Sequence, residues 1–209
     1  MLSHYAERFS TVEINATFYR LPTHAALEGW AAATPASFVF TLKAPQRITH
    51  HRRLVGVDEH LRRFVDVAAV LGPKLGPLFF QLPPTFKKEP GRLADLLAML
   101  PPGRRAAFEF RHASWFADEV YALLGTRDAA LCIADTEDGT TPEVATATWG
   151  YLRLRDADYT DAALDGWAER IAGHGWRDAF VYFKHEDGVT PEAGVLAAVR
   201  LRDRLGRAA

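Results

Sequence analysis

Seven short apolar runs, each closing on a polar or charged residue, constrain the fold of this chain more than any other feature. They cover residues 12–15, 38–43, 78–81, 108–111, 131–135, 151–153 and 180–184. Both faces of these runs stay largely apolar until the last residue or two, a pattern typical of strands that are buried on both sides. Segments with helical period separate most of the runs; residues 58–72, for example, carry one apolar stripe of Leu61, Phe64, Val65, Ala68 and Leu71. The sequence therefore predicts an α/β protein in which parallel strands alternate with helices.

Two α/β architectures fit this alternation, a (β/α) barrel and a doubly wound open sheet. The open sheet normally binds a nucleotide through a glycine-rich turn after its first strand, and the chain has no GxGxxG or Walker-type loop. We therefore predict a TIM-barrel-like barrel with seven visible strands and no organic cofactor. Residues 135–149 are rich in threonine and are expected to form a connection without a helix. No linker or repeat interrupts residues 1–209, which predicts a single domain.

Composition narrows the classes of function. Of the 209 residues 48% are hydrophobic and 24% charged, values that are ordinary for a globular protein with a sizeable core. The formal net charge of -1 argues against a dedicated nucleic-acid binder. No apolar stretch approaches the ~20 residues that span a bilayer, and the chain does not begin with a signal-peptide pattern. The single cysteine, Cys132, lies in an apolar run, so we expect it to be a core residue. One cysteine cannot form an intramolecular disulfide, which fits a reducing compartment, so we expect a cytoplasmic protein.

Charged residues at the ends of the runs indicate where chemistry would take place. Glu109 and Arg111 share one face of their strand because alternate side chains point to opposite faces. Charges in an apolar layer are costly unless paired, so this face should line a solvated site at the carboxyl ends of the strands. Glu13 closes another run, and two carboxylates that flank a substrate can divide the acid and base roles, as in glycosidases. Alternatively, each carboxylate pairs with a neighbouring cation in a structural network.

Cations at the same ends suggest the ligand. Those that close runs, and those on a following loop, are Lys43, Arg111, Arg153, Lys184, Arg47 and His50. Arginine suits the bidentate capture of phosphate or carboxylate, so the set predicts a site for an anionic or polyhydroxylated small molecule. Alternatively, these cations only neutralise Glu13, Glu109 and Asp135. The basic residues 50–53 form either a solvated loop or a contact surface for a partner, and His50 has the stronger claim to a site role.

Two further hypotheses rest on weaker patterns. A divalent cation could be held by a mixed set of carboxylates and an imidazole, drawn from Glu13, Glu109, Asp135 and His112 or His185. No HxH, HExxH or paired CxxC motif is present, so we assign no metal ligand. Aromatic residues after the strand ends either stack on a sugar or base or pack against the core; they are Phe18, Tyr19, Trp115, Phe116 and Tyr159.

Four stretches of the chain carry a family resemblance. They are residues 5–19, 79–84 (FFQLPP), 108–116 (FEFRHASWF) and 151–154 (YLRL). Together they resemble the family of domain of unknown function 72, the YecE-like proteins, over nearly the whole chain. The resemblance implies a TIM-barrel-like fold but no reaction. It also implies signature segments that contain Glu13, Asn15, Lys43, Thr49, His50, Gln81, Glu109, Arg111 and His112.

The chain departs from the family pattern in two places. Family members usually begin with a glycine-rich strand ahead of the segment that matches residues 5–7, whereas this chain begins inside the first helix. A barrel without that strand would be N-terminally truncated and would have two unpaired edges, so we expect the native start to lie upstream of Met1. Arg155 and Asp156 stand where the family often has His-Gly, which weakens a role for the end of that strand.

The leading hypothesis is an enzyme, of hydrolase type, that acts on a small polar or anionic substrate. Acid–base roles are assigned to Glu13, Glu109 and His112. Binding roles are assigned to Asn15, Lys43, His50, Gln81, Arg111, Asp135, Arg153 and Lys184. The alternatives are a barrel that binds a ligand or partner without turnover, and a divalent-metal-dependent hydrolase or isomerase.

Overall fold

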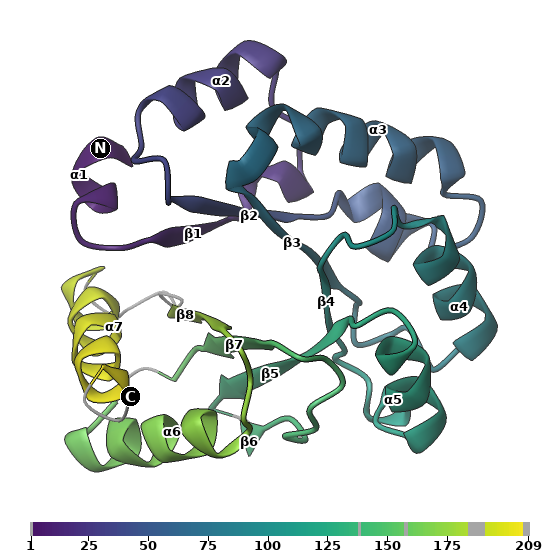
Figure 1. Cartoon of the computed structure of the whole chain (residues 1–209). Coiled ribbons are helices and arrows are strands. Elements are labelled where there is room, and N and C mark those ends of the chain that lie inside the picture. The colour runs from purple at the N-terminus through teal and green to yellow at the C-terminus, as the bar shows by residue number, and fades with distance from the viewer. Residues whose placement is uncertain (1, 138, 157–158, 184–190, 207–209) are drawn as a thin grey trace. The chain divides into compact units, whose positions relative to one another are not determined.

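The computed structural model describes residues 2–137, 139–156, 159–183 and 191–206, apart from the side chains of residues 191 and 192. The chain divides into two compact units, Met1–Ala129 and Ala130–Ala209. The single-domain prediction concerns both units together and stays a prediction. Figure 1 labels the helices and strands of each unit, which are described separately below.

The first unit is a parallel sheet with helices between its strands. Its strands are β1 (Thr11–Ile14), β2 (Val39–Lys43), β3 (Leu75–Gln81) and β4 (Ala106–Glu109), paired in that order. Its α-helices are α1 (Leu2–Ala6), α2 (His24–Ala32), α3 (Asp58–Ala68), α4 (Pro90–Met99) and α5 (Asp118–Gly125). Shorter turns are η1 (Ala16–Phe18), η2 (Arg47–His51), η3 (Ala69–Lys74) and η4 (Ala113–Trp115).

The two faces of this sheet differ in chemistry. One face packs against helices: Trp30 of α2 stacks on Phe40, and Phe64 of α3 packs edge-on against Phe80. The four helices α2 to α5 lie on that side of the strands in Figure 1. Glu13 pairs with Thr41, and Gln81 pairs with Glu109, and these side chains belong to the opposite face. The helix-facing layer is thus apolar, whereas the other face of the strands carries the polar side chains at the strand ends together with Phe79 and Ala107.

The second unit repeats the same plan on a smaller scale. Its parallel strands are β5 (Ala130–Thr136), β7 (Gly150–Leu154) and β8 (Ala179–Phe183), and the short β6 (Gly139–Thr140) pairs antiparallel with β5. Its helices are α6 (Asp161–Gly173) and α7 (Pro191–Leu205). Ile133, Leu152 and Leu154 form one core cluster with Leu164, Trp167 and Leu201 of these helices.

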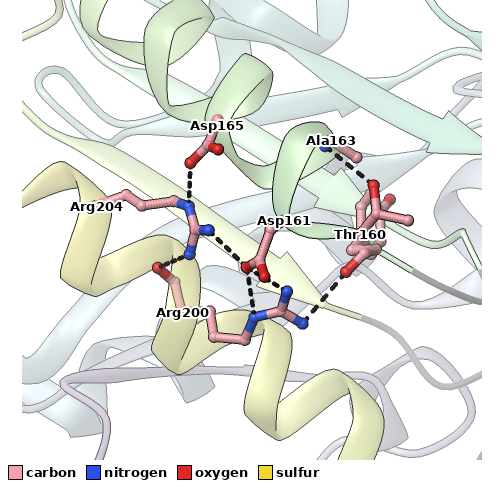
Figure 2. A network of polar contacts seen from close by, with 7 residues as sticks. Thr160, Asp161, Ala163, Asp165, Arg200 and Arg204 are labelled. Atoms are coloured by element: carbon pink, nitrogen blue, oxygen red, sulfur yellow. Dashed lines mark hydrogen bonds and ion pairs between the residues drawn. The ribbon is translucent and has the colours of Figure 1, made fainter.

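Ion pairs join α6 to α7 on the outside of this unit (Figure 2). Thr160 caps α6 by accepting a hydrogen bond from the Ala163 amide at 3.2 Å. Asp161 accepts hydrogen bonds from Arg200 and from Arg204, and Arg204 also pairs with Asp165. These contacts lower the pKa of Asp161, chiefly through its hydrogen bonds to Arg200 and Arg204. Because Asp161 is exposed, these pairs contribute little to the stability of the fold.

The observed elements confirm the predicted fold class. Each of the seven predicted strands is present, and parallel strands alternate with helices as in TIM-barrel-like α/β proteins. Residues 135–149 hold no helix in the part that the structure describes, but they contain the short strand β6, which the sequence did not predict. No described helix is both long enough and apolar enough to cross a membrane. Cys132 is buried, as its apolar surroundings predicted.

Candidate functional site

A buried hydrogen-bonded chain links the ends of three strands in the first unit. Lys43 Nζ at the end of β2 donates to Gln81 Oε1 of β3 at 2.6 Å. Gln81 Nε2 donates in turn to Glu109 Oε1 of β4 at 2.5 Å. The Nε of Arg111, just after β4, donates to the same Glu109 oxygen at 2.9 Å. The exposed fractions of Lys43, Gln81 and Glu109 are only 9%, 5% and 1%, so this polar layer is held by its own contacts rather than by bulk water.

The Phe18 ring brings a second basic group beside Lys43. Lys43 Nζ lies 4.4 Å from the centroid of the Phe18 ring, close enough for a cation–π interaction. The imidazole of His50 packs edge-on against the same ring, with the centroids 4.9 Å apart. His50 Nδ1 is also within hydrogen-bond distance, 2.9 Å, of the hydroxyl of the buried Thr49. Phe18 therefore joins the end of β2 to the turn that carries His50.

That turn has an unusual backbone. Residues Arg47–His51 form η2, a π-helical turn, a conformation that occurs frequently at functional sites. Arg53 and Leu54 follow with φ values of 46° and 68°, in the left-handed region that non-glycine residues rarely adopt. Leu54 is buried and its amide donates to the Ile48 carbonyl at 3.0 Å, which holds the turn closed. Backbone strain of this kind is found mostly at functional sites, and here it directly follows the turn that carries His50.

Burial and neighbouring positive charges both act on the pKa of the His50 imidazole. Burial and the nearby charges of Lys43, Arg111 and His51 lower the pKa of His50 to about 4. Burial is the largest cause, followed by Lys43 and then Arg111. His50 is therefore a neutral imidazole at physiological pH, able to accept or donate a hydrogen bond.

A pH dependence of stability is expected from His50. The unfolded chain takes up this proton near pH 6.5, whereas the folded protein takes it up only near pH 4. Protonation between these values favours the unfolded chain, so stability falls as the pH is lowered from 6.5 towards 4. Denaturant unfolding at several pH values should show a smaller fall in His50→Gln than in the wild type. A His50 resonance that titrates near 6.5 in an NMR experiment would contradict this prediction.

The remaining predicted residues of the first unit lie at the ends of β1 and β4. Asn15 Nδ2 donates to Glu13 Oε1 at 2.9 Å, and both residues reach more solvent than Glu109 does. His112 is used locally: its Nδ1 accepts a hydrogen bond from the Ser114 amide at 3.1 Å and so caps η4. In the neutral ring this leaves the proton of His112 on Nε2. An acid–base role for His112 stays a prediction.

The structure does not place the predicted residues of the second unit on one face. Arg153 pairs in register with Ala134, so its side chain shares the face of Ala134, and the next residue, Asp135, points to the opposite face. There Asp135 accepts hydrogen bonds from Tyr159 Oη at 2.8 Å and from Thr140 Oγ1 at 2.7 Å. Burial is the main cause that raises the pKa of Tyr159; the hydrogen bond to Asp135 adds to the rise, and the hydrogen bond from the Asp156 amide opposes it. Lys184 lies outside the described residues.

Sequence reasoning missed Thr17, the residue of the first unit that holds Phe18 beside Lys43. Thr17 is 1% exposed, and its hydroxyl lies 2.9 Å from the Ile14 carbonyl oxygen and 2.7 Å from that of Lys43. It ties η1 to the end of β2 and thereby places Phe18 over Lys43. No local pattern marks a threonine for a contact with a residue 26 positions away. Among the residues that the structure describes, no three His, Cys, Asp or Glu side chains gather as a metal-binding group.

Comparison with known proteins identifies the family. The family model described as protein of unknown function DUF72 matches residues 1–209. This chain belongs to the DUF72 family. Its sequence is 34% identical to UPF0759 protein YecE of Escherichia coli K12 over 117 residues, which are 56% of this DUF72 chain and 43% of the E. coli protein. It is 27% identical to UPF0759 protein YunF of Bacillus subtilis 168 over 203 residues, 88% of this chain and 70% of that protein. The chain thus matches less than half the length of the E. coli relative.

Solved structures of other DUF72 proteins have the same fold. A DUF72 protein of Enterococcus faecalis V583 has a TM-score of 0.82 at 18% identity, covering 99% of this chain and 93% of its own. A DUF72 protein of Thermotoga maritima MSB8 has a TM-score of 0.77 at 22% identity, covering 95% and 85%. These likenesses show the fold of this DUF72 chain. The match to the family model confirms the family resemblance carried by the sequence motifs.

Proposed function

We propose that the first unit binds a small anionic molecule of the phosphate-ester class at the carboxyl ends of β1 to β4, and that the protein is an enzyme acting on it. The meeting of Lys43 and His50 on the Phe18 ring carries this proposal. Arg111 lies near enough to influence the same imidazole. Lys43 and Arg111 would supply the positive charge that captures a phosphoryl group, and the neutral His50 imidazole would supply a hydrogen bond.

The basic groups are held in position before any ligand arrives. Gln81 orients the Lys43 ammonium, and Glu109 orients the Arg111 guanidinium. Lys43 is also largely shielded from water, which strengthens its attraction for an anion relative to a lysine on the surface. Because less freedom is lost on binding, such an arrangement favours affinity and a defined ligand orientation.

Hydrolysis is the reaction that these groups support best. Glu13 and Glu109 come from the ends of β1 and β4, and they would divide the acid and base roles. The base would remove a proton from the attacking water while the acid protonates the leaving oxygen of the ester. The basic groups would neutralise the charge that develops on the phosphoryl oxygens.

Titration calorimetry with inorganic phosphate, a hexose phosphate and the unphosphorylated hexose tests the proposal. Inorganic phosphate and the hexose phosphate are expected to bind in the micromolar to millimolar range typical of substrates. The unphosphorylated hexose is expected to bind far more weakly because it lacks the charge. Phosphate release from the ester should be slowed strongly in Glu13→Gln, with the affinity for inorganic phosphate kept. The proposal would be overturned if neither inorganic phosphate nor the hexose phosphate bound at millimolar concentration.

A ligand-binding protein without turnover is the second candidate. It is favoured by the contacts of Glu109, where one carboxylate oxygen accepts from both Gln81 and Arg111. A carboxylate held by two donors is suited to be a fixed counterion, whereas proton transfer needs a group that can exchange its proton. Binding of the hexose phosphate with no product after prolonged incubation would favour this candidate over the enzyme.

A further inference from the structure

We propose that Tyr19 recognises the body of the ligand, and that the ligand is a sugar phosphate whose ring lies on Tyr19 while its phosphoryl group meets Lys43 and His50. This inference rests on the proposed function and names its substrate class. It assigns to Tyr19 the role of a specificity-determining residue.

Tyr19 is notable for its exposure. Among the exposed large hydrophobic residues in the described part of the chain, Tyr19 has the highest exposed fraction, 75%, compared with 59% for Leu196 and 51% for Val55. Its ring contacts Phe18 edge to face, with centroids 5.0 Å apart and planes at 90°. An aromatic ring that is largely open to water offers a surface on which an apolar ring face can be buried.

The position of Tyr19 links it to the basic groups. The Phe18 ring that it contacts is also the ring approached by Lys43 Nζ and by the imidazole of His50. The Tyr19 ring and the Lys43 ammonium both contact the Phe18 ring. The distance between them therefore cannot exceed the sum of those two contact distances. A single monosaccharide with its phosphoryl group can reach across such a span.

The backbone that carries Tyr19 is fixed. The Tyr19 amide donates to the Ala16 carbonyl at 3.1 Å and closes η1, and Thr17 anchors η1 to the Lys43 carbonyl. The fold therefore holds the backbone of Tyr19 at a set distance from the end of β2. A fixed spacing is what a site needs if it is to recognise both ends of one small molecule.

The neighbouring polar groups favour a sugar over a nucleobase. Glu13 and Asn15, at the end of β1, offer carboxylate oxygens and an amide, which hydrogen-bond to hydroxyl groups. The C–H groups on one face of a pyranose carry slight positive charge and pack well on the negative face of an aromatic ring. Asn15 precedes Tyr19 by four residues in the chain, so hydroxyl partners and an open aromatic ring come from one short segment.

Calorimetry on Tyr19→Ala with two probes separates the roles of the phosphate and the sugar. We expect Tyr19→Ala to weaken glucose 6-phosphate binding roughly 3- to 10-fold, the size of one aromatic contact, and to leave inorganic phosphate binding unchanged. Tyr19→Trp should retain glucose 6-phosphate binding, and Val55→Ala, a change at another exposed hydrophobic residue, should alter neither.

Each other outcome has a distinct meaning. Equal glucose 6-phosphate affinity in Tyr19→Ala and the wild type would overturn the role of Tyr19 while the proposed function stands. A Tyr19-dependent affinity for adenosine monophosphate, with none for glucose 6-phosphate, would replace the sugar by a base and overturn the proposal. Failure of inorganic phosphate and of both esters to bind the wild type would overturn the proposed function and this inference together.

Discussion

Replacing Glu109 by glutamine is expected to lower the free energy of unfolding by about 2 to 4 kcal/mol. Glu109 is 1% exposed and accepts hydrogen bonds from Gln81 and Arg111, while Lys43 is bound to the other end of Gln81. The amide keeps the shape of the side chain but removes the negative charge that pairs with Arg111. Part of the cost is relieved because Arg111 is 38% exposed.

Urea-induced unfolding measures this effect, with Glu119→Gln as the matched control. Glu119 also pairs with a cation, Lys88, but its side chain is 56% exposed. The control should therefore change stability by at most about 1 kcal/mol. Equal stability of Glu109→Gln and the wild type would mean that the buried pair adds nothing to the fold. Loss of turnover in that variant would then be evidence for a direct role in the reaction.

Replacing Lys43 by methionine is expected to weaken binding of inorganic phosphate roughly 10- to 100-fold, the size of one charge-assisted hydrogen bond in a shielded site. Methionine keeps the length and apolar stem of lysine, so the packing on Phe18 is largely retained. The same change should raise the pKa of His50, because the Lys43 charge is one of the causes that lower it. Calorimetry measures the affinity, and NMR titration measures the pKa.

Lys88→Met provides the control for this experiment. Lys88 is a lysine of the same unit whose ammonium pairs with the exposed Glu119. We expect it to leave both the phosphate affinity and the His50 pKa unchanged. Phosphate affinity in Lys43→Met equal to that of the wild type would exclude Lys43 as the phosphate ligand, whatever the effect on His50.

Alternation along a strand let the sequence predict much of the site. Glu109 and Arg111 were expected on one face, and the 2.9 Å hydrogen bond between them is the contact that this parity allows. The apolar partners Phe108 and Phe110 are buried, as expected for the other face. Alternation did not predict that Asp135 and Arg153 lie on opposite faces of the sheet, because it relates only residues within one strand. Which face of β5 matches which face of β7 depends on their register.

The sequence by itself determined the α/β class, the seven strands, the family and the enrichment of polar groups at strand ends, because these depend on local periodicity and on motifs. Only the tertiary structure decided that Gln81 bridges Lys43 to Glu109, since the β3–β4 register pairs Gln81 with Glu109. It alone placed Thr17, Phe18 and His50 around Lys43. Contacts between residues far apart in the chain follow from how strands and turns pack, and hydrogen-bond partners at such distances leave no pattern in the sequence.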